Sequence, residues 1–267
     1  MDSSFHKQIT QVATHLKKKG FPYTIQGFNE LDSTNGKAKE LALAGVHENT
    51  VVVAQIQKKG RGRFERTWES PPGGLYFSLI LRPKGPADQM TMIPLIAGLA
   101  VTKAIRSLFQ LPSMIKWPND VRIHGKKVAG ILLEGETKQD QVHYVIVGVG
   151  VNVNNPVEQL PIQLQATATS LIRERGTRVD YGLFFESVLS AFHEEFIRFE
   201  QGDVSSLLSS WKTYSDTLGK RVKIKTVSGD IVGEAVDIDC SGFLVVLTDD
   251  GEQKIVTSGD CLYVDEL

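Results

Sequence analysis

One segment, Tyr144 to Asn154 (YVIVGVGVNVN), restricts what this chain can fold into more than any other feature. Alternate residues of a β-strand point to opposite faces of its sheet. One face of this segment carries valines, which indicates a buried core. The other face carries Gly148 and Gly150, followed by Asn152, so it offers bare backbone beside an amide. Glycine weakens a strand, so this face predicts either a ligand lying against the backbone or close packing of another part of the chain.

A second strand is expected at 50–57, and it leads directly into a basic loop. Val51 and Val53 share a face with Gln55 and Gln57, which predicts a pocket with an apolar base and an amide rim. Taken alone, a glutamine such as Gln57 is more often a surface residue than a ligand-binding one.

The basic loop itself, Lys58 to Trp68 (KKGRGRFERTW), holds five basic residues and one acidic residue, although the net charge of the 267-residue chain is only −1. Arginine side chains and the exposed N–H groups of a glycine-rich backbone together suit phosphate oxygens. The loop lacks the Gly-Lys-Ser/Thr ending of the common nucleotide-binding loop, which excludes that class of NTPase. A solvated charge run or a weak RNA contact stays open from the loop alone.

The remaining pattern predicts an α+β protein with two domains, at residues 1–216 and 217–267. Helices are expected at 5–16, 93–108, 185–199 and 207–214, and another is expected between capping residues at 32–35 and a stop at Gly45. Further strands are expected at 23–31, 75–81, 114–117, 128–133 and 143–153. From Leu218 onward, short alternating strands are separated by evenly spaced Gly-containing turns, which is typical of a small β-barrel.

Several classes of protein are disfavoured by composition. We find no signal peptide and no uncharged apolar run of the ~20 residues that a membrane span needs. Cys240 and Cys261 are too few for a metal cage and are expected to be free thiols, so we predict a soluble, cytoplasmic protein. The single N-terminal helix is too little for a DNA-reading domain.

Two further motifs lie between the loop and the glycine-bearing strand: Lys116 to Asp120 (KWPND) and Lys126 to Glu134 (KKVAGILLE). Singly, the first is compatible with a proline turn and the second with an exposed strand lysine. In this order, together with Asp32 to Asn35 (DSTN), the basic loop and Ala168 to Leu171 (ATSL), the motifs resemble those of the biotin protein ligases. The resemblance runs from about Asp32 to the C-terminus and is to the form without an N-terminal winged-helix repressor domain.

The resemblance implies a mixed β-sheet catalytic domain of the biotin/lipoate ligase type with flanking helices, followed by an SH3-like β-barrel. It implies an enzyme that forms biotinyl-5′-AMP and pyrophosphate from biotin and ATP with Mg²⁺, and then passes biotin to a lysine of a biotin carboxyl carrier domain. DNA and membranes are not expected partners. Whether the chain forms a homodimer stays open.

The resemblance also assigns residues to the site. Those expected at biotin are Ser33, Thr34, Asn35, Gln57, Arg61, Gly62, Arg63, Lys127, Gly130, Gly148 and Gly150. Those expected at ATP are Arg61, Arg63, Trp68, Asn119, Lys127 and Asn152. Lys127, Arg61 and Arg63 are the expected catalytic residues, because two anions must be brought together. No dedicated protein ligand is expected for the metal, since Mg²⁺ binds mainly through the ATP phosphates.

The loop departs from the family pattern at one position, because Glu65 stands where the family usually has glycine. This carboxylate is expected either to lie near the adenylate or to pair with Arg66. Three alternatives to biotin ligation stay open: a lipoate or octanoate ligase of the same superfamily, an RNA-binding or phosphate-sensing module, and a sensor that makes the adenylate only as a signal.

Overall fold

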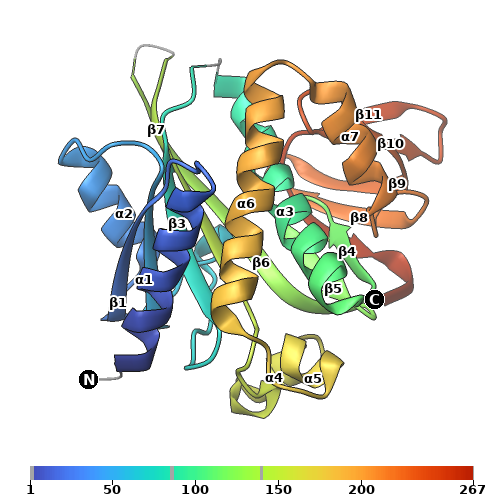
Figure 1. Cartoon of the computed structure of the whole chain (residues 1–267). Helices are drawn as coiled ribbons and strands as arrows, with labels where there is room; N and C mark the ends of the chain where they lie inside the picture. The colour runs from blue at the N-terminus through green and yellow to red at the C-terminus, as the bar shows by residue number, and fades with distance from the viewer. Residues whose placement is uncertain (1–2, 85–86, 139–140, 267) are drawn as a thin grey trace.

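A seven-stranded mixed sheet forms the larger part of the protein (Figure 1). The computed structural model describes residues 3–84, 87–138 and 141–266. The strand order is β1-β2-β3-β7-β6-β5-β4, with β1 and β2 parallel and every other neighbouring pair antiparallel. The strands are β1 (Thr24–Leu31), β2 (Thr50–Gln57), β3 (Leu75–Leu81), β4 (Ser113–Lys116), β5 (Asp120–Ile123), β6 (Lys126–Lys138) and β7 (Gln141–Val151).

Helices cover both faces of this sheet, but unequally. On one face, α1 (Ser3–Lys18), α3 (Met92–Phe109) and α6 (Tyr181–Glu200) enclose the main core with the valine face of β7. On the other face, α2 (Thr34–Leu43) packs on Val52, Ile80 and Ile146 in a smaller apolar cluster. The remaining helical segments are η1 (Arg63–Glu65), η2 (Ala87–Thr91), η3 (Val157–Gln159), α4 (Ile162–Gln165), α5 (Leu171–Arg175), α7 (Val204–Thr213) and η4 (Val264–Glu266).

Most expected elements are confirmed. The strand expected at 143–153 spans Gln141–Val151 as β7, and two other strands differ more. The strands expected at 50–57 and 75–81 begin and end where the pattern placed them. The strand expected at 128–133 is longer, because β6 extends from Lys126 to Lys138 alongside β7. Strand β5 was missed: Asp120–Ile123 is only four residues long and directly follows a proline turn, so no alternating pattern has room to develop.

A second, five-stranded antiparallel sheet follows, in the order β11-β10-β9-β8-β12. Its strands are β8 (Arg221–Thr226), β9 (Gly229–Ile238), β10 (Leu244–Thr248), β11 (Gln253–Val256) and β12 (Asp260–Tyr263). This is the small all-β unit that the turn spacing predicted. It lies against the α3, α7 and β4 side of the larger sheet (Figure 1).

The two sheets share one apolar core. Val222, Ile224 and Leu244 of the second sheet are fully buried in the same cluster as the residues of α3 and α6. The indole N–H of Trp117 donates a hydrogen bond to the Gly242 carbonyl at 3.1 Å. We propose a domain boundary between residues 216 and 217, although packing across it is continuous.

Helix α3 passes through the centre of this core. The segment Gln89–Phe109 is long and apolar enough to cross a membrane by length and composition, with a mean hydropathy of 1.5. However, 67% of its most apolar 18-residue window is buried inside the protein, between the sheet and α6. Its apolar character is therefore that of a core helix.

Candidate functional site

The glycine face of β7 forms the floor of the site. A Cβ atom on Gly148 would lie less than 3.0 Å from Asn35 Oδ1, and a Cβ on Gly150 would lie less than 3.0 Å from Trp68 Nε1. Both distances are shorter than real Cβ contacts, so any side chain here would displace its neighbour. The bare strand therefore allows close packing of two other predicted site residues, and both glycines also line a cavity.

The fourteen residues predicted for the site are brought together around this cavity, whose volume is about 270 Å³. They come from the start of α2, the end of β2, the basic loop, the β4–β5 turn, β6 and β7. The residues are Ser33, Thr34, Asn35, Gln57, Arg61, Gly62, Arg63, Trp68, Asn119, Lys127, Gly130, Gly148, Gly150 and Asn152.

One end of the cavity is lined by neutral polar groups. Ser33 caps α2 by accepting a hydrogen bond from the Gly36 N–H at 3.3 Å, as its position before the helix predicts. The backbone N–H and hydroxyl of Thr34 both donate to Gln57 Oε1, at 2.8 and 3.0 Å. Ser78 Oγ lies 2.5 Å from Asn35 Oδ1. These groups form a preorganised polar network in a buried place.

The expected pocket is only partly correct: its two valines are buried in the main core and do not line the cavity, and only one of its two glutamines does. Gln57 lines this cavity, and its Nε2 donates to Ser70 Oγ at 2.9 Å. Gln55 instead lines a separate pocket beside α1, with Phe5 and Gln8. Gln55 follows the alternation of the two valines toward α1, whereas Gln57, the last residue of β2, lies where the chain turns into the basic loop and reaches the cavity.

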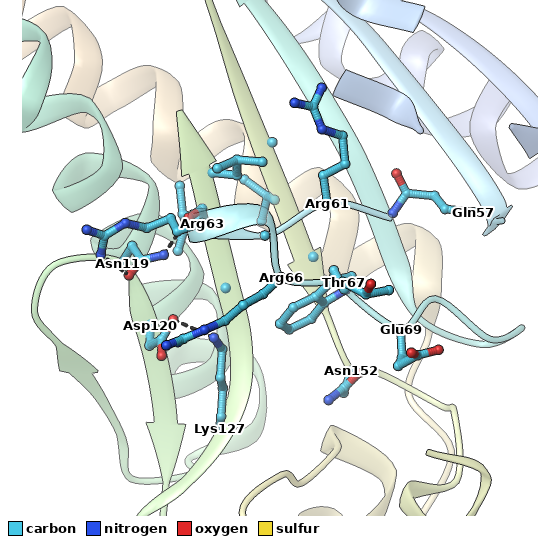
Figure 2. A pocket seen from close by; sticks show the side chains of 18 of the residues that line it. Gln57, Arg61, Arg63, Arg66, Thr67, Glu69, Asn119, Asp120, Lys127 and Asn152 are labelled. Carbon is cyan, nitrogen blue, oxygen red and sulfur yellow. Dashed lines mark hydrogen bonds and ion pairs between the residues drawn. The ribbon is translucent and has the colours of Figure 1, made fainter. Parts of the chain in front are cut away.

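The basic loop is a small hairpin rather than an irregular coil (Figure 2). Arg61 and Thr67 form a β-bridge, the Gly62 N–H donates to the Arg66 carbonyl at 2.7 Å, and the Trp68 N–H donates to the Gly60 carbonyl at 3.0 Å. The hairpin places Trp68 in the cavity wall, where its ring packs against Gly150 of the floor.

Glu65 occupies the tip of this hairpin with a φ angle of 58°. Glycine adopts such a left-handed conformation without the steric cost of a Cβ atom, which gives a physical reason for the family's usual glycine. Glu65 is exposed and does not line the cavity. Pairing of Glu65 with Arg66 was also wrong, because Arg66 forms its ion pair with Asp260.

One of the three loop arginines binds β6, and the other two reach the second sheet. Arg61 forms an ion pair with Glu134 at 2.8 Å. Arg63 donates to Asn119 Oδ1 and to the Gly259 carbonyl, both at 3.1 Å, and burial lowers its pKa.

Arg66 holds both carboxylate oxygens of Asp260, at 3.2 and 2.5 Å. This bidentate contact lowers the pKa of Asp260 and raises that of Arg66. Together, Arg63 and Arg66 join the loop to the second sheet.

Lys127 points into the cavity from β6 (Figure 2). Its Nζ forms an ion pair with Asp120 Oδ1 at 2.7 Å and lies 5.3 Å from the centre of the Trp68 ring. A Cβ on Gly130 would lie 3.3 Å from the same Nζ, so the glycine leaves room for the end of the Lys127 side chain beside the strand. The cation is therefore held at the junction of the floor, the loop and β5.

Two asparagines hold the walls of the cavity in place. Asn119 donates to the Ile131 carbonyl at 2.8 Å, and its Oδ1 accepts from Arg63. Asn152 donates to the Thr169 carbonyl at 3.0 Å. In contrast, among the described residues the buried Trp68 Nε1–H finds no acceptor, although it borders the cavity. A buried donor of this kind suits a ligand that brings an acceptor.

Sequence reasoning missed four residues that shape the site: Ser78, Asp120, Glu134 and Asp260. Asp120 and Glu134 lie inside the quoted motifs KWPND and KKVAGILLE, so their presence was visible but their pairing with Lys127 and Arg61 was not. Ser78 and Asp260 reach the site through strand pairing and packing of the second sheet, for which no local signal exists.

Comparisons with known proteins agree with this geometry. A model of the Biotin/lipoate A/B protein ligase family matches residues 27–152, and a model of the Biotin protein ligase C terminal domain matches residues 217–263. The fold and the site therefore define a member of the biotin/lipoate ligase class.

Individual relatives narrow the class. The Bacillus subtilis bifunctional ligase/repressor BirA is 36% identical over 229 residues, covering 85% of this chain and 70% of the relative. The biotin–[acetyl-CoA-carboxylase] ligase of Paracoccus denitrificans is 34% identical over 228 residues, covering 84% and 94%. The structure of the Aquifex aeolicus biotin protein ligase in complex with biotin and ATP matches with a TM-score of 0.77 and 33% identity, covering 91% and 98%. This chain belongs to the biotin protein ligase family, which confirms the resemblance and the fold class.

Proposed function

We propose that this enzyme condenses biotin with ATP to biotinyl-5′-AMP and pyrophosphate, and then transfers the biotinyl group to one lysine of a biotin carboxyl carrier domain. The observation that carries this proposal is a single cavity with a neutral polar end at Thr34 and Gln57 and a cationic centre at Lys127. Such a cavity suits a ligand that has a neutral polar head group at one end and a carboxylate at the other.

The neutral end suits the ureido ring of biotin, which offers N–H donors and one carbonyl acceptor. Ser33, Thr34, Asn35 and Gln57 supply hydroxyl and amide groups of both kinds around this end. Their existing hydrogen bonds fix their orientation before any ligand binds, which lowers the entropy cost of binding. Gly148 leaves the width that Asn35 needs beside the ring.

The cationic centre suits the first chemical step. A carboxylate oxygen of biotin attacks the α-phosphorus of ATP, the bond from this phosphorus to the bridging oxygen breaks, and the electron pair leaves with pyrophosphate. The two reacting groups are anions, so Lys127, Arg61 and Arg63 lower the barrier by neutralising charge. No protein nucleophile is required, because positioning and electrostatics are sufficient.

Internal carboxylates hold two of these cations in place. Asp120 and Glu134 bind Lys127 and Arg61 at 2.7 and 2.8 Å. Substrate oxygens would share or replace these contacts, so the cations are already oriented toward the cavity. Trp68, Asn119 and Asn152 form the wall that we assign to the nucleotide.

Magnesium is expected to arrive with the nucleotide as part of the substrate. Among the described residues, no group of three His, Cys, Asp or Glu side chains could hold a metal ion. We propose that Mg²⁺ binds mainly through the ATP phosphates. Cys240 and Cys261 are both free, which is compatible with action in the cytoplasm.

The proposal is tested by transfer of biotin to a recombinant biotin carboxyl carrier domain. With ATP, Mg²⁺ and biotin, the intact mass of the domain should increase by one biotinyl group. A carrier whose acceptor lysine is replaced by arginine is the control and should stay unmodified. Failure of the wild-type carrier to gain mass with biotin would contradict the proposal.

A further inference from the structure

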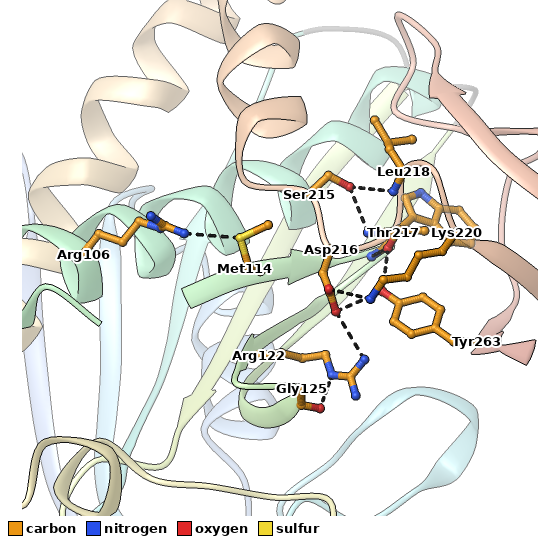
Figure 3. A network of polar contacts seen from close by, with 11 residues as sticks. Arg106, Met114, Arg122, Gly125, Ser215, Asp216, Thr217, Leu218, Lys220 and Tyr263 are labelled. Carbon is orange, nitrogen blue, oxygen red and sulfur yellow. Dashed lines mark hydrogen bonds and ion pairs between the residues drawn. The ribbon is translucent and has the colours of Figure 1, made fainter. Parts of the chain in front are cut away.

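A second group of cations surrounds one aromatic ring just outside the cavity. Lys116 Nζ and Lys220 Nζ lie 4.5 and 4.2 Å from the centre of the Tyr263 ring, and the Arg122 guanidinium carbon lies 5.2 Å from it. Lys116 and Arg122 come from the first sheet, whereas Tyr263 lies on β12 of the second sheet. The group therefore forms at the junction of the two sheets, and Figure 3 shows Arg122, Lys220 and Tyr263 there.

One carboxylate serves two of these three cations. Asp216 binds Lys220 at 2.7 Å and Arg122 at 3.3 Å, and the Tyr263 hydroxyl lies 3.3 Å from the same carboxylate. Within the described part of the chain, Lys116 has no carboxylate oxygen at ion-pair distance, and its close contact is the ring. Lys116 is therefore the one cation of this group that forms no ion pair within the described part of the chain.

Strand register connects Lys116 to the cavity floor. Lys116 pairs with Asp120 on β5, Asp120 pairs with Gly130 on β6, and Gly130 pairs with Gly150 on β7. Residues directly opposite each other on neighbouring strands point to the same face of a sheet. Lys116 therefore lies on the cavity face, one strand beyond Asp120, at a spacing of about 4.8 Å per strand.

Lys116, Asp120, Gly130 and Gly150 thus form a row across four neighbouring strands. This row indicates where the departing pyrophosphate binds. In the proposed reaction, pyrophosphate leaves the α-phosphorus on the side opposite the biotin carboxylate, which binds between the neutral end and Lys127. Asp120 is already neutralised by Lys127, and Asp260 by Arg66. Beyond them, the next side chain in the row is the unmatched cation of Lys116.

We propose that Lys116 binds the β- and γ-phosphates of ATP, and after bond cleavage the pyrophosphate, while the Tyr263 ring holds its ammonium group toward the cavity. This inference rests on the proposed function. In the cleavage step Lys116 stabilises the negative charge that the departing pyrophosphate receives with the electron pair, and no proton is transferred. Lys220, bound to Asp216, has a structural role at the same ring.

The test compares Lys116→Met with Lys220→Met, because each change removes one cation from the same ring. Direct binding of pyrophosphate and of ATP with Mg²⁺ is measured by calorimetry, without an acid substrate. Loss of one charged contact to phosphate should weaken both affinities about tenfold or more in Lys116→Met, and less than about threefold in Lys220→Met. Lys116→Arg should retain most of the affinity, and biotin affinity should not change.

A purely structural lysine would give a different result. If Lys116→Met and the wild type bind pyrophosphate equally, while both methionine variants lose similar thermal stability, the inference is overturned. Wild-type protein that binds no pyrophosphate would also overturn it. Absence of biotin transfer with normal pyrophosphate binding would contradict only the proposed function.

Discussion

Gly148 and Gly150 lie two residues apart on one strand, yet each makes room for a different neighbour. Gly148 accommodates Asn35 at the neutral end of the cavity, and Gly150 accommodates Trp68 at the wall assigned to ATP. We therefore expect Gly148→Ala to raise the KM for biotin and Gly150→Ala to raise the KM for ATP, each by about tenfold or more, because an ordered side chain must move.

The KM values for biotin and for ATP are measured by steady-state kinetics of both variants. Gly36→Ala is the matched control, since the nearest heavy atom to its added Cβ would be 3.6 Å away, an ordinary contact. Equal effects of Gly148→Ala and Gly150→Ala on both substrates would show that the two glycines do not divide the cavity as described.

Among the elements, the basic loop depends most on a distant partner. Arg66 and Asp260 join its hairpin to β12, and the hydrogen bond from Arg66 lowers the pKa of Asp260 below its usual value of 3.8. A lowered folded-state pKa means that the contact contributes fully at neutral pH and is lost as the pH falls through that lowered pKa. The Arg66 side chain is 63% exposed, so the contribution is expected to be only about 0.5–1 kcal/mol.

We expect Asp260→Asn to increase amide hydrogen exchange in residues 60–68 by a few fold at neutral pH. The variant should also show a smaller change in the protection of this loop between neutral and acidic pH than the wild type does. Asp249→Asn is a matched control, because Asp249 forms a similar bidentate pair with Arg221 elsewhere in the same sheet. Unchanged exchange in the loop of Asp260→Asn would indicate that Arg63 alone fixes its conformation.

The elements also show what local sequence could and could not predict. Strands with strict alternation, such as the valine and glycine faces of β7, were predictable because one residue's direction fixes the next. Strand β5 was too short for this. Alternation correctly placed Val51, Val53 and Gln55 on one face, but that face lies toward α1, and only Gln57 at the end of the strand reaches the cavity. Asp260 is 194 residues from its partner Arg66, so only tertiary packing could bring it to the site.

For the whole molecule, a shared core predicts shared stability. Leu244 of β10 is fully buried in the cluster that includes Trp117 and Trp211 of the larger domain. Leu244→Ala should therefore destabilise the entire chain by about 2–5 kcal/mol. Tryptophan fluorescence and far-UV circular dichroism should report one coincident unfolding transition.

The control for this prediction is Ile255→Ala on the neighbouring strand β11. The Ile255 side chain is 61% exposed, so its removal should change the free energy of unfolding little. A Leu244→Ala protein that loses the second sheet in a separate, earlier transition would show that the two sheets are energetically independent.

The central claim, that Lys127 stabilises the first half-reaction on biotin, is tested most directly by biotin-dependent exchange of pyrophosphate into ATP. Lipoate and octanoate are run in parallel, and Lys126→Ala is the control because the adjacent lysine does not line the cavity. We predict exchange with biotin alone, about 100-fold or more slower in Lys127→Ala and nearly unchanged in Lys126→Ala. Exchange supported by lipoate or octanoate instead of biotin, or a Lys127→Ala protein as active as the wild type, would contradict the account.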